Sequence, residues 1–381
     1  MRTSPAVFIA GAAILIVVIW DAFESIILPR RVTRQFRLTR LFYRTSWSIW
    51  KFTCGLIPSR KIRETAMGVF GPISLLILLA VWAVGLVLGF GLMQYGAGSA
   101  LNVTGITPSL STDIYLSGTT FFTLGLGDVL PRSGLARFLV VVESGLGFGF
   151  LAAVIGYLPF IYGSFSKREV NISLLDSRAG TPPTAGELLR RHSYPHGQEA
   201  LRELLKEWEF WCAELMESHL SYPVLAFFRS QHDNQSWIAS LTAILDACAL
   251  IMVGIEGACE KQAQLTFAIA RHAVVDLSQV FNTSPQELSD DRLPVAELQR
   301  IRDVLTEHGL KLHDGAAADK RLAELRHMYE PYIYALASYL KQSLPPWIPQ
   351  KKGKDNWQTT AWARSTGFVK SQPTVAVDDH F

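Results

Sequence analysis

A short segment with two glycines at alternate positions lies between two long apolar stretches, and no other feature limits the possible folds so strongly. The segment is Thr123-Leu-Gly-Leu-Gly-Asp128, between the uncharged residues 65–95 and the apolar residues 138–166. Glycine adopts left-handed φ values that residues with a Cβ avoid, so Gly125 and Gly127 permit a strand with alternating φ. Successive carbonyl oxygens of such a strand point the same way, and rings of them can replace the water around a bare cation.

Three stretches are long and apolar enough to cross a membrane, which predicts a membrane half and a water-soluble half. The first span lies within residues 1–29, the second within 65–95 and the third within 138–166. Hydrophobic residues make up 49% of the chain and charged residues only 18%, and the apolar ones concentrate in its first half. No small-residue cleavage site follows the first stretch, so we expect a retained span rather than a signal peptide.

Residues 30–66 form a basic segment between the first two spans. From Arg30 to Arg63 there are ten basic residues and no acidic one before Glu64, so the positive-inside rule places the segment in the cytoplasm. The amino terminus then lies outside and the carboxyl terminus inside. Apolar residues interleave with the charges, so we expect a helix in the interface; a voltage sensor would need partner helices with acidic countercharges. The arginines expected to contact anionic headgroups are Arg30, Arg31, Arg34, Arg37 and Arg40.

Asp21 and Glu24 interrupt the first span near its cytoplasmic end. Charges are costly in lipid unless they face protein, water or a cation. Two interpretations remain open: the acids pair with Arg30 or Arg31 beside the inner headgroups, or they couple movement of the spans to the opening of a pore.

Residues 67–165 are predicted to form a pore domain. Residues 109–122 are too few to cross a bilayer, and we expect a short helix there, with Ser109 or Ser111 as its N-cap. The glycine segment follows this helix directly, and irregular backbone at membrane depth is tolerated only where it lines a cavity or is buried in protein. One chain supplies one strand and a cation path of this kind needs about four, so we expect a homotetramer with cyclic symmetry.

The glycine segment and its flanking spans resemble the pore domain of potassium channels, whose filter usually reads Thr-Val-Gly-Tyr-Gly-Asp. The Gly-Leu-Gly-Asp form is closest to the second pore loop of two-pore-domain potassium channels, and the resemblance covers residues 69–163. It implies that K⁺ is the permeant ion, bound by backbone carbonyls and a threonine hydroxyl, with Asp128 bracing the outer mouth. The filter residues are then Thr123, Leu124, Gly125, Leu126 and Gly127.

Two departures from the family pattern change what can hold the filter at its diameter. Leu126 stands where the family has Tyr, which removes the hydroxyl that ties the filter to the pore helix, and Phe122 stands where it has Thr. We therefore expect apolar packing by Leu126, Phe121 and Phe122 around the filter. Glu143 is expected either to act as a strut behind the filter or to tune its ion occupancy.

Gly147 lies where the resemblance places a glycine hinge on the inner helix. Gly145 and Gly149 flank it in the third span. Two interpretations have equal weight: Gly147 bends this span when the pore opens, or it permits close packing of helices in lipid.

The second half of the chain is predicted to be helical and cytoplasmic. We expect a linker at residues 166–183, a helical domain at 184–344 and a flexible tail at 345–381. Within residues 237–281 the stretch 238–255 is apolar enough for another membrane hairpin, although its Asp246 counts against one. A net charge of +3 is too small to indicate nucleic-acid binding, and the four cysteines lack zinc or disulfide spacing.

These features predict an all-α membrane protein with three transmembrane helices, a re-entrant pore helix and filter loop, and a cytoplasmic α-helical domain. The resemblance implies a tetrameric, potassium-selective channel of the plasma (inner) membrane, gated by its inner helix and by an unidentified ligand of the cytoplasmic domain. The alternatives are a non-selective cation channel and a non-conducting membrane-anchored sensor or scaffold. We expect neither enzymatic activity nor a cofactor.

Overall fold

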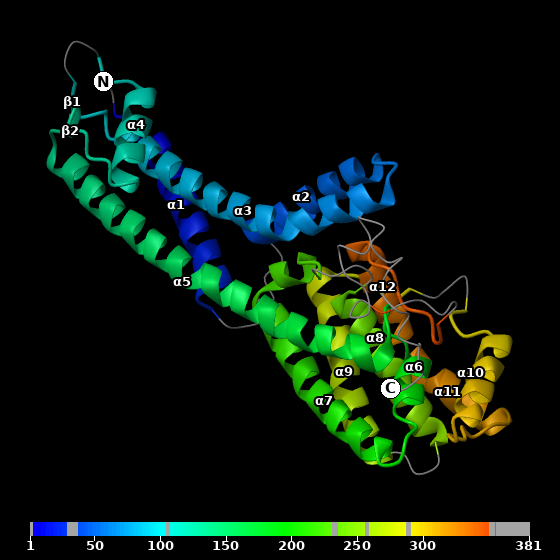
Figure 1. The fold of residues 1–381 in the computed structure, drawn as a ribbon. Helices are drawn as coiled ribbons and strands as arrows, with labels where there is room; N and C mark the ends of the chain where they lie inside the picture. The colour runs from blue at the N-terminus through cyan, green and yellow to red at the C-terminus, as the bar shows by residue number, and fades with distance from the viewer. Residues whose placement is uncertain are drawn as a thin grey trace, which may run out of the picture. The chain divides into compact units, whose positions relative to one another are not determined.

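The computed structural model describes residues 3–28, 37–103, 107–230, 235–255, 259–286, 291–349 and 355. The described chain is almost entirely helical and forms two compact units, residues 1–163 and 164–381 (Figure 1). Among the described residues, four helices are long and apolar enough to cross a membrane. They are α1 (Pro5–Ile26), α3 (Arg60–Gly96), α5 (Gly134–Ala179) and α8 (Trp237–Gly254).

In the first unit, α1 packs closely against α3. A Cβ added to Gly89 would lie 2.5 Å from Leu15 Cδ2, and one added to Gly11 would lie 2.6 Å from the Gly89 carbonyl oxygen. A Cβ at Gly11 would meet backbone, and one at Gly89 would require the Leu15 side chain to move, so small residues let these membrane helices approach closely. The shared core of this pair includes Leu15, Val18, Trp82, Leu86 and Phe90.

Asp21 organises the cytoplasmic end of α1. Helix α2 (Leu38–Gly55) begins beside it, and the Asp21 carboxylate accepts hydrogen bonds from the Thr39 backbone N–H at 3.1 Å and from Trp82 Nε1 at 2.9 Å. A carboxylate is favourable there because the first backbone N–H groups of a helix lack partners. Glu24 pairs with Arg37 at 3.4 Å. Arg30 and Arg31, which the sequence suggests as partners of these acids, lie outside the described residues, as does Arg34.

Helix α4 (Leu110–Phe121) begins at the predicted N-cap, Ser109, whose N–H donates to the Thr112 hydroxyl at 3.2 Å. Strands β1 (Leu101–Val103) and β2 (Val129–Pro131) pair antiparallel, with Asn102 opposite Leu130. The strands are three residues each, too short for sequence periodicity to reveal. Their pairing joins the chain before α4 to the chain after the glycine segment.

Helix α5 continues well beyond the third predicted span, so the linker expected at 166–183 is wrong as far as Ala179. The polar residues of this stretch do not break the helix, because Ile172, Leu175 and Ala179 are buried in the second unit. The helix ends at Gly180, whose φ of +79° is the left-handed conformation that commonly terminates helices.

The second unit is a helical bundle around α8. Every residue of α8 from Trp237 to Ile251 is buried, so its apolar surface is covered by protein. The neighbouring helices in contact with it are α6, α7, α9, α11 and α12. The bounds of the remaining helices are α6 Ala185–Arg191, α7 Gly197–Ser221, the 3₁₀ turn η1 Pro223–Phe227, α9 Glu260–Phe281, α10 Val295–Glu307, α11 Ala316–His327 and α12 Glu330–Leu340.

A buried ionic group lies at the middle of α8. Asp246 is fully buried, forms an ion pair with Arg292 and accepts a hydrogen bond from the Tyr329 hydroxyl. Arg292 also lies 3.6 Å from Glu330. A charge inside a core is tolerated when it is paired and hydrogen-bonded. Asp246 is therefore explained by protein partners rather than by contact with a lipid headgroup or water.

Arg168 fastens the end of α5 to this bundle. Its guanidinium donates to the carbonyl oxygens of Leu225 at 2.9 Å and Phe228 at 2.7 Å, and lies 3.2 Å from His219 Nε2. Burial, and then the charge of Arg168, lower the pKa of His219 well below its usual range. His219 is thus neutral: Nδ1–H donates to the Leu215 carbonyl oxygen at 2.9 Å, leaving Nε2 to accept from Arg168.

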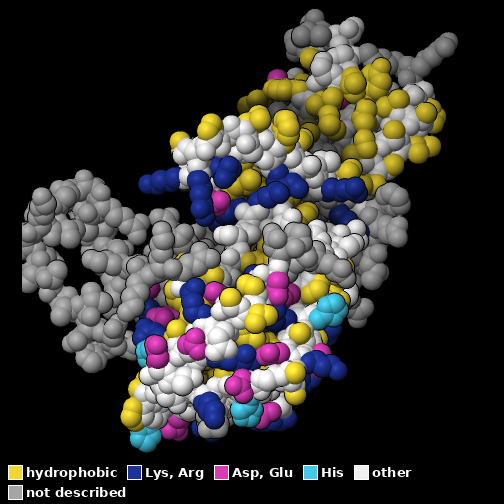
Figure 2. All heavy atoms as spheres, turned by 90° about the vertical axis from the view of Figure 1, so that its right-hand side faces the viewer, with side chains coloured by type: hydrophobic (Ala, Val, Ile, Leu, Met, Phe, Trp, Pro, Cys, Tyr) yellow, Lys and Arg dark blue, Asp and Glu magenta, His cyan; other side chains and the backbone are white. Residues whose placement is uncertain are grey.

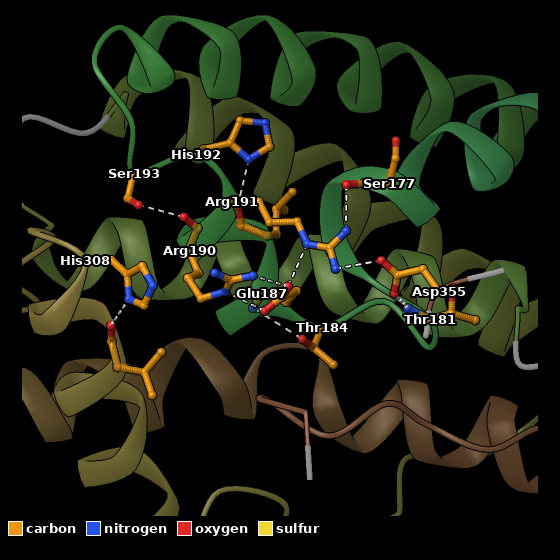
Figure 3. Close-up of polar contacts among 12 residues, drawn as sticks. Ser177, Thr181, Thr184, Glu187, Arg190, Arg191, His192, Ser193, His308 and Asp355 are labelled. Carbon is orange, nitrogen blue, oxygen red and sulfur yellow. Dashed lines mark hydrogen bonds and ion pairs between the residues drawn. The ribbon is translucent and has the colours of Figure 1, made fainter. Parts of the chain in front are cut away.

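Part of the predicted tail is also packed. Trp347 and Ile348 are buried, so flexibility from residue 345 onward is wrong for these positions. Asp355 accepts from Arg191 Nη2 at 2.7 Å and from the Thr181 N–H at 3.1 Å, beside the Glu187 carboxylate that Arg191 also contacts (Figure 3). The other residues beyond 349 lie outside the described part of the chain.

Candidate functional site

The backbone of the glycine segment alternates in conformation. Gly125 and Gly127 have φ values of +58° and +78°, as the sequence predicts for a strand of alternating φ. Thr123 also has a positive φ, +57°, which is uncommon for a residue with a Cβ. The side chains of the segment are exposed in the single chain. Left-handed residues thus recur at every second position, which is the geometry that ring-forming carbonyls require.

The end of α4 holds the start of this segment. The Leu124 N–H donates to the Thr119 carbonyl oxygen at 2.7 Å, and the Thr123 N–H donates to that of Thr120 at 3.0 Å. The last carbonyls of a helix otherwise lack partners. The segment therefore satisfies them, and the position of its first residues depends directly on the position of α4.

Tyr115 holds the far end of the segment, and sequence reasoning missed it. Its hydroxyl donates to Asp128 Oδ2 at 2.9 Å. The expected brace at Asp128 thus has a definite partner. Leu126 has no hydroxyl with which the segment could bond to the helix. Here the hydroxyl belongs to Tyr115 on α4, and the helix donates to the segment. The sequence did contain a signal for this pair: Tyr115 lies about two turns before the end of the short helix, and Asp128 ends the loop that follows it.

Replacing Tyr115 with phenylalanine is expected to loosen the segment without disturbing α4. One hydrogen bond contributes about 1 kcal/mol, so under the channel function proposed below we expect up to about a fivefold change in ion discrimination, measured as the Rb⁺ to Na⁺ flux ratio in proteoliposomes. The control is Tyr95→Phe, since the Tyr95 hydroxyl makes no hydrogen bond to a described residue. An unchanged ratio in Tyr115→Phe would contradict the bracing role of this pair.

Glu143 lies behind α4 and is fully buried. It contacts the Ser117 hydroxyl, which also lies 2.7 Å from the Val87 carbonyl oxygen. These three groups belong to α5, α4 and α3, so they connect all three helices of the pore region. Glu143 therefore links α5 to α4, a position compatible with either of its two expected roles, as a strut or in tuning ion occupancy.

Gly147 lies against the end of α4. A Cβ added at Gly147 would approach the Phe121 carbonyl oxygen closer than 3.0 Å, whereas one added at Gly145 or Gly149 would have no neighbour within 4 Å. Among these three glycines, the structure therefore requires a missing Cβ only at Gly147. Close packing, one of its two interpretations, is present in the fold.

The apolar collar expected around the filter is incomplete in one chain. Phe121 is buried and its ring lies 5.8 Å from that of Phe150, but the side chains of Phe122 and Leu126 are 60% and 65% exposed. In one chain only Phe121 of the three is buried, and packing of all three around a filter stays a prediction. Phe122 directly precedes the segment and Leu126 lies within it, so two large apolar side chains are exposed in the sequence region of the glycines.

No cluster of three or more His, Cys, Asp or Glu side chains suited to a metal ion occurs within the described ranges. The oxygen atoms that residues 123–127 offer are their backbone carbonyls and the Thr123 hydroxyl. These oxygens suit a dehydrated alkali cation, which is bound by many weak oxygen ligands rather than by a few strong ones.

Comparisons with known proteins agree with this location. A family described as ion channels matches residues 74–159, which include most of α3, all of α4, the glycine segment and the first part of α5. The chain is 23% identical over 264 residues to the uncharacterized membrane protein YdjJ of Bacillus subtilis (strain 168), covering 67% of this chain and 74% of that protein. No solved structure matches the chain.

Proposed function

Because the ion-channel match covers the elements that hold the glycine segment, we propose that the protein is a tetrameric, potassium-selective channel. The alternating positive φ values at Thr123, Gly125 and Gly127 carry this proposal. Carbonyl oxygens of residues 124–127 and the Thr123 hydroxyl form the rings through which K⁺ passes. Carbonyl rings replace the hydration shell of the ion, so the protein needs no charged ligand in the path.

The tetramer follows from the incomplete site in one chain. Each subunit supplies one filter strand, and the apolar side chains of Phe122 before it and of Leu124 and Leu126 within it are exposed. Cyclic assembly brings four strands to a common axis and covers these side chains with the next subunit. A site built this way does not exist in the monomer.

Gating acts through α5, which runs without a break from the pore region to Ala179. In this proposal Gly147 is the place where α5 bends, and a ligand of the second unit biases opening by binding one state more tightly. The amino terminus lies outside the plasma (inner) membrane and the second unit lies in the cytoplasm.

Flux of Rb⁺ into liposomes that contain the purified full-length protein tests the proposal. We expect flux from the wild type and a loss of at least about tenfold in Gly125→Ala, because a Cβ at a φ of +58° strains the backbone and narrows the ring. Reversal potentials that follow K⁺ and ignore Na⁺ exclude a non-selective cation channel. Absence of flux in both proteins supports a non-conducting sensor or scaffold.

We also propose that α2 lies on the anionic headgroups of the inner leaflet. Trp47 and Cys54 face the protein, and Trp50 Nε1 donates to the Ala66 carbonyl oxygen at 3.2 Å. The exposed side chains of α2, of Leu56 just after it and of the first residues of α3 include apolar and basic ones together, and a row of Lys and Arg is visible in Figure 2. The exposed residues are Leu41, Ile49, Phe52, Leu56, Arg40, Arg44, Arg60 and Lys61.

The charges of α2 predict a dependence on lipid composition. A basic side chain near an anionic surface contributes about 1 kcal/mol, so anionic lipid should raise the thermal stability of the wild type more than that of Arg40→Gln/Arg44→Gln. Arg137→Gln, in the exposed first turn of α5, is the control and should respond as the wild type does. Equal stabilisation of all three proteins would contradict the proposal.

A further inference from the structure

The Ser117 hydroxyl lies between two oxygen atoms, and this arrangement determines where protons can be. Its Oγ is 2.7 Å from the Val87 carbonyl oxygen and within hydrogen-bond distance of Glu143 Oε1. A serine hydroxyl has one proton to donate and a carbonyl oxygen can only accept. Ser117 can therefore donate to one of its two neighbours, and the other neighbour must donate to Ser117.

Only Glu143 can be that donor. An ionised carboxylate has no proton, so it would compete with the Val87 carbonyl for the single hydroxyl proton of Ser117. The oxygen left without a proton would then face the Ser117 lone pairs at contact distance. A protonated Glu143 removes this conflict: it donates to Ser117, and Ser117 donates to Val87.

The surroundings of Glu143 agree with the neutral form. Glu143 is fully buried, and none of the described Lys, Arg or His side chains forms an ion pair with it. Its second oxygen, Oε2, has no hydrogen-bond partner in the described part of the chain. The acid on the facing helix α4 is Asp113, one turn before Ser117. Asp113 accepts a hydrogen bond from Ser99 at 2.6 Å, and as an acid it cannot stabilise a negative charge on Glu143. An ionised carboxylate is strongly disfavoured in such a place.

We propose that Glu143 is held as a neutral carboxylic acid that donates a hydrogen bond to Ser117, forming a relay from α5 through α4 to α3. Ser117 lies six residues before Thr123, so the relay fixes the helix whose last carbonyls hold the filter. Its consequence for conduction depends on the proposed channel function. The protonation state itself does not.

Infrared difference spectroscopy of the purified full-length protein at neutral pH tests the relay. The wild type minus Glu143→Gln spectrum should contain the C=O stretching band of a protonated carboxylic acid. The control is Glu199→Gln, which replaces an exposed glutamate of α7 and should show carboxylate bands instead. Ser117→Ala should keep the acid band but shift it to higher wavenumber, because the acid proton loses its acceptor.

Carboxylate bands in place of the acid band for Glu143 would overturn the proposal. An acid band whose position does not change in Ser117→Ala would also overturn the proposal. Neither reading requires ion flux. If the acid band is present and Rb⁺ flux is absent, the proposed channel function fails while the relay stands; the reverse result removes only the relay.

Discussion

Gly147→Ala is expected to reduce Rb⁺ flux at least about tenfold and to lower the thermal stability of the protein. The added Cβ would lie closer than 3.0 Å to the Phe121 carbonyl oxygen, and a backbone atom cannot rotate away as a side chain can. Overpacking of this kind typically costs about 1–3 kcal/mol. Phe121 lies two residues before Thr123, so the displacement reaches the filter directly. Flux and melting temperature of the same preparation measure both effects.

Gly145→Ala and Gly149→Ala are the matched controls for this prediction. A Cβ at either position meets no described atom within 4 Å, and alanine has a better helix propensity than glycine. Both variants should therefore melt at or above the temperature of the wild type. If all three alanine variants behave alike, the close contact between Gly147 and α4 does not explain why glycine is needed at position 147.

Arg168→Met is expected to destabilise the second unit by about 3 kcal/mol or more. Methionine keeps an unbranched apolar stem but removes the donor to the Phe228 carbonyl oxygen and one of the two donors to the Leu225 carbonyl oxygen, which keeps the Phe228 N–H. A buried polar atom left without a partner costs about 1–3 kcal/mol, and both the Phe228 carbonyl oxygen and His219 Nε2 lose their donor. Thermal unfolding and limited proteolysis of the full-length protein measure the loss.

Lys167→Met is the matched control, because Lys167 precedes Arg168 on α5 and is exposed. It should change stability by no more than about 0.5 kcal/mol, as surface substitutions usually do. Arg168→Lys should recover part of the stability, since its ammonium can reach one carbonyl but not both. Equal stability of the methionine variants at 167 and 168 would contradict the anchoring role of Arg168.

Local sequence signals were sufficient where structure depends on neighbouring residues. The N-cap at Ser109 depends on a hydroxyl at the first turn, and the positive φ of Gly125 and Gly127 depends on the absence of a Cβ. The end of α5 was misplaced because the polar composition after residue 166 resembles a linker. Burial of Ile172 and Leu175 by helices distant in the sequence keeps that stretch helical.

Residue composition was also ambiguous for α8. It is long and apolar enough for a membrane span, and apart from Asp246 nothing along the helix distinguishes a lipid-facing surface from a protein-facing one. The covering helices α7, α9, α11 and α12 make that distinction, together with the partners of Asp246. Arg292 and Tyr329 lie 46 and 83 residues away from Asp246, beyond the reach of any local pattern.

The glycine segment shows the same division at the functional site. Its ability to form a ladder of carbonyls follows from the order Thr-Leu-Gly-Leu-Gly-Asp, because φ is a property of each residue and its Cβ. What holds the segment was decided by tertiary contacts: Tyr115 with Asp128, Ser117 with Glu143, and Gly147 with the Phe121 carbonyl. Such contacts depend on which faces of three helices meet, and that is a property of packing rather than of spacing along the chain.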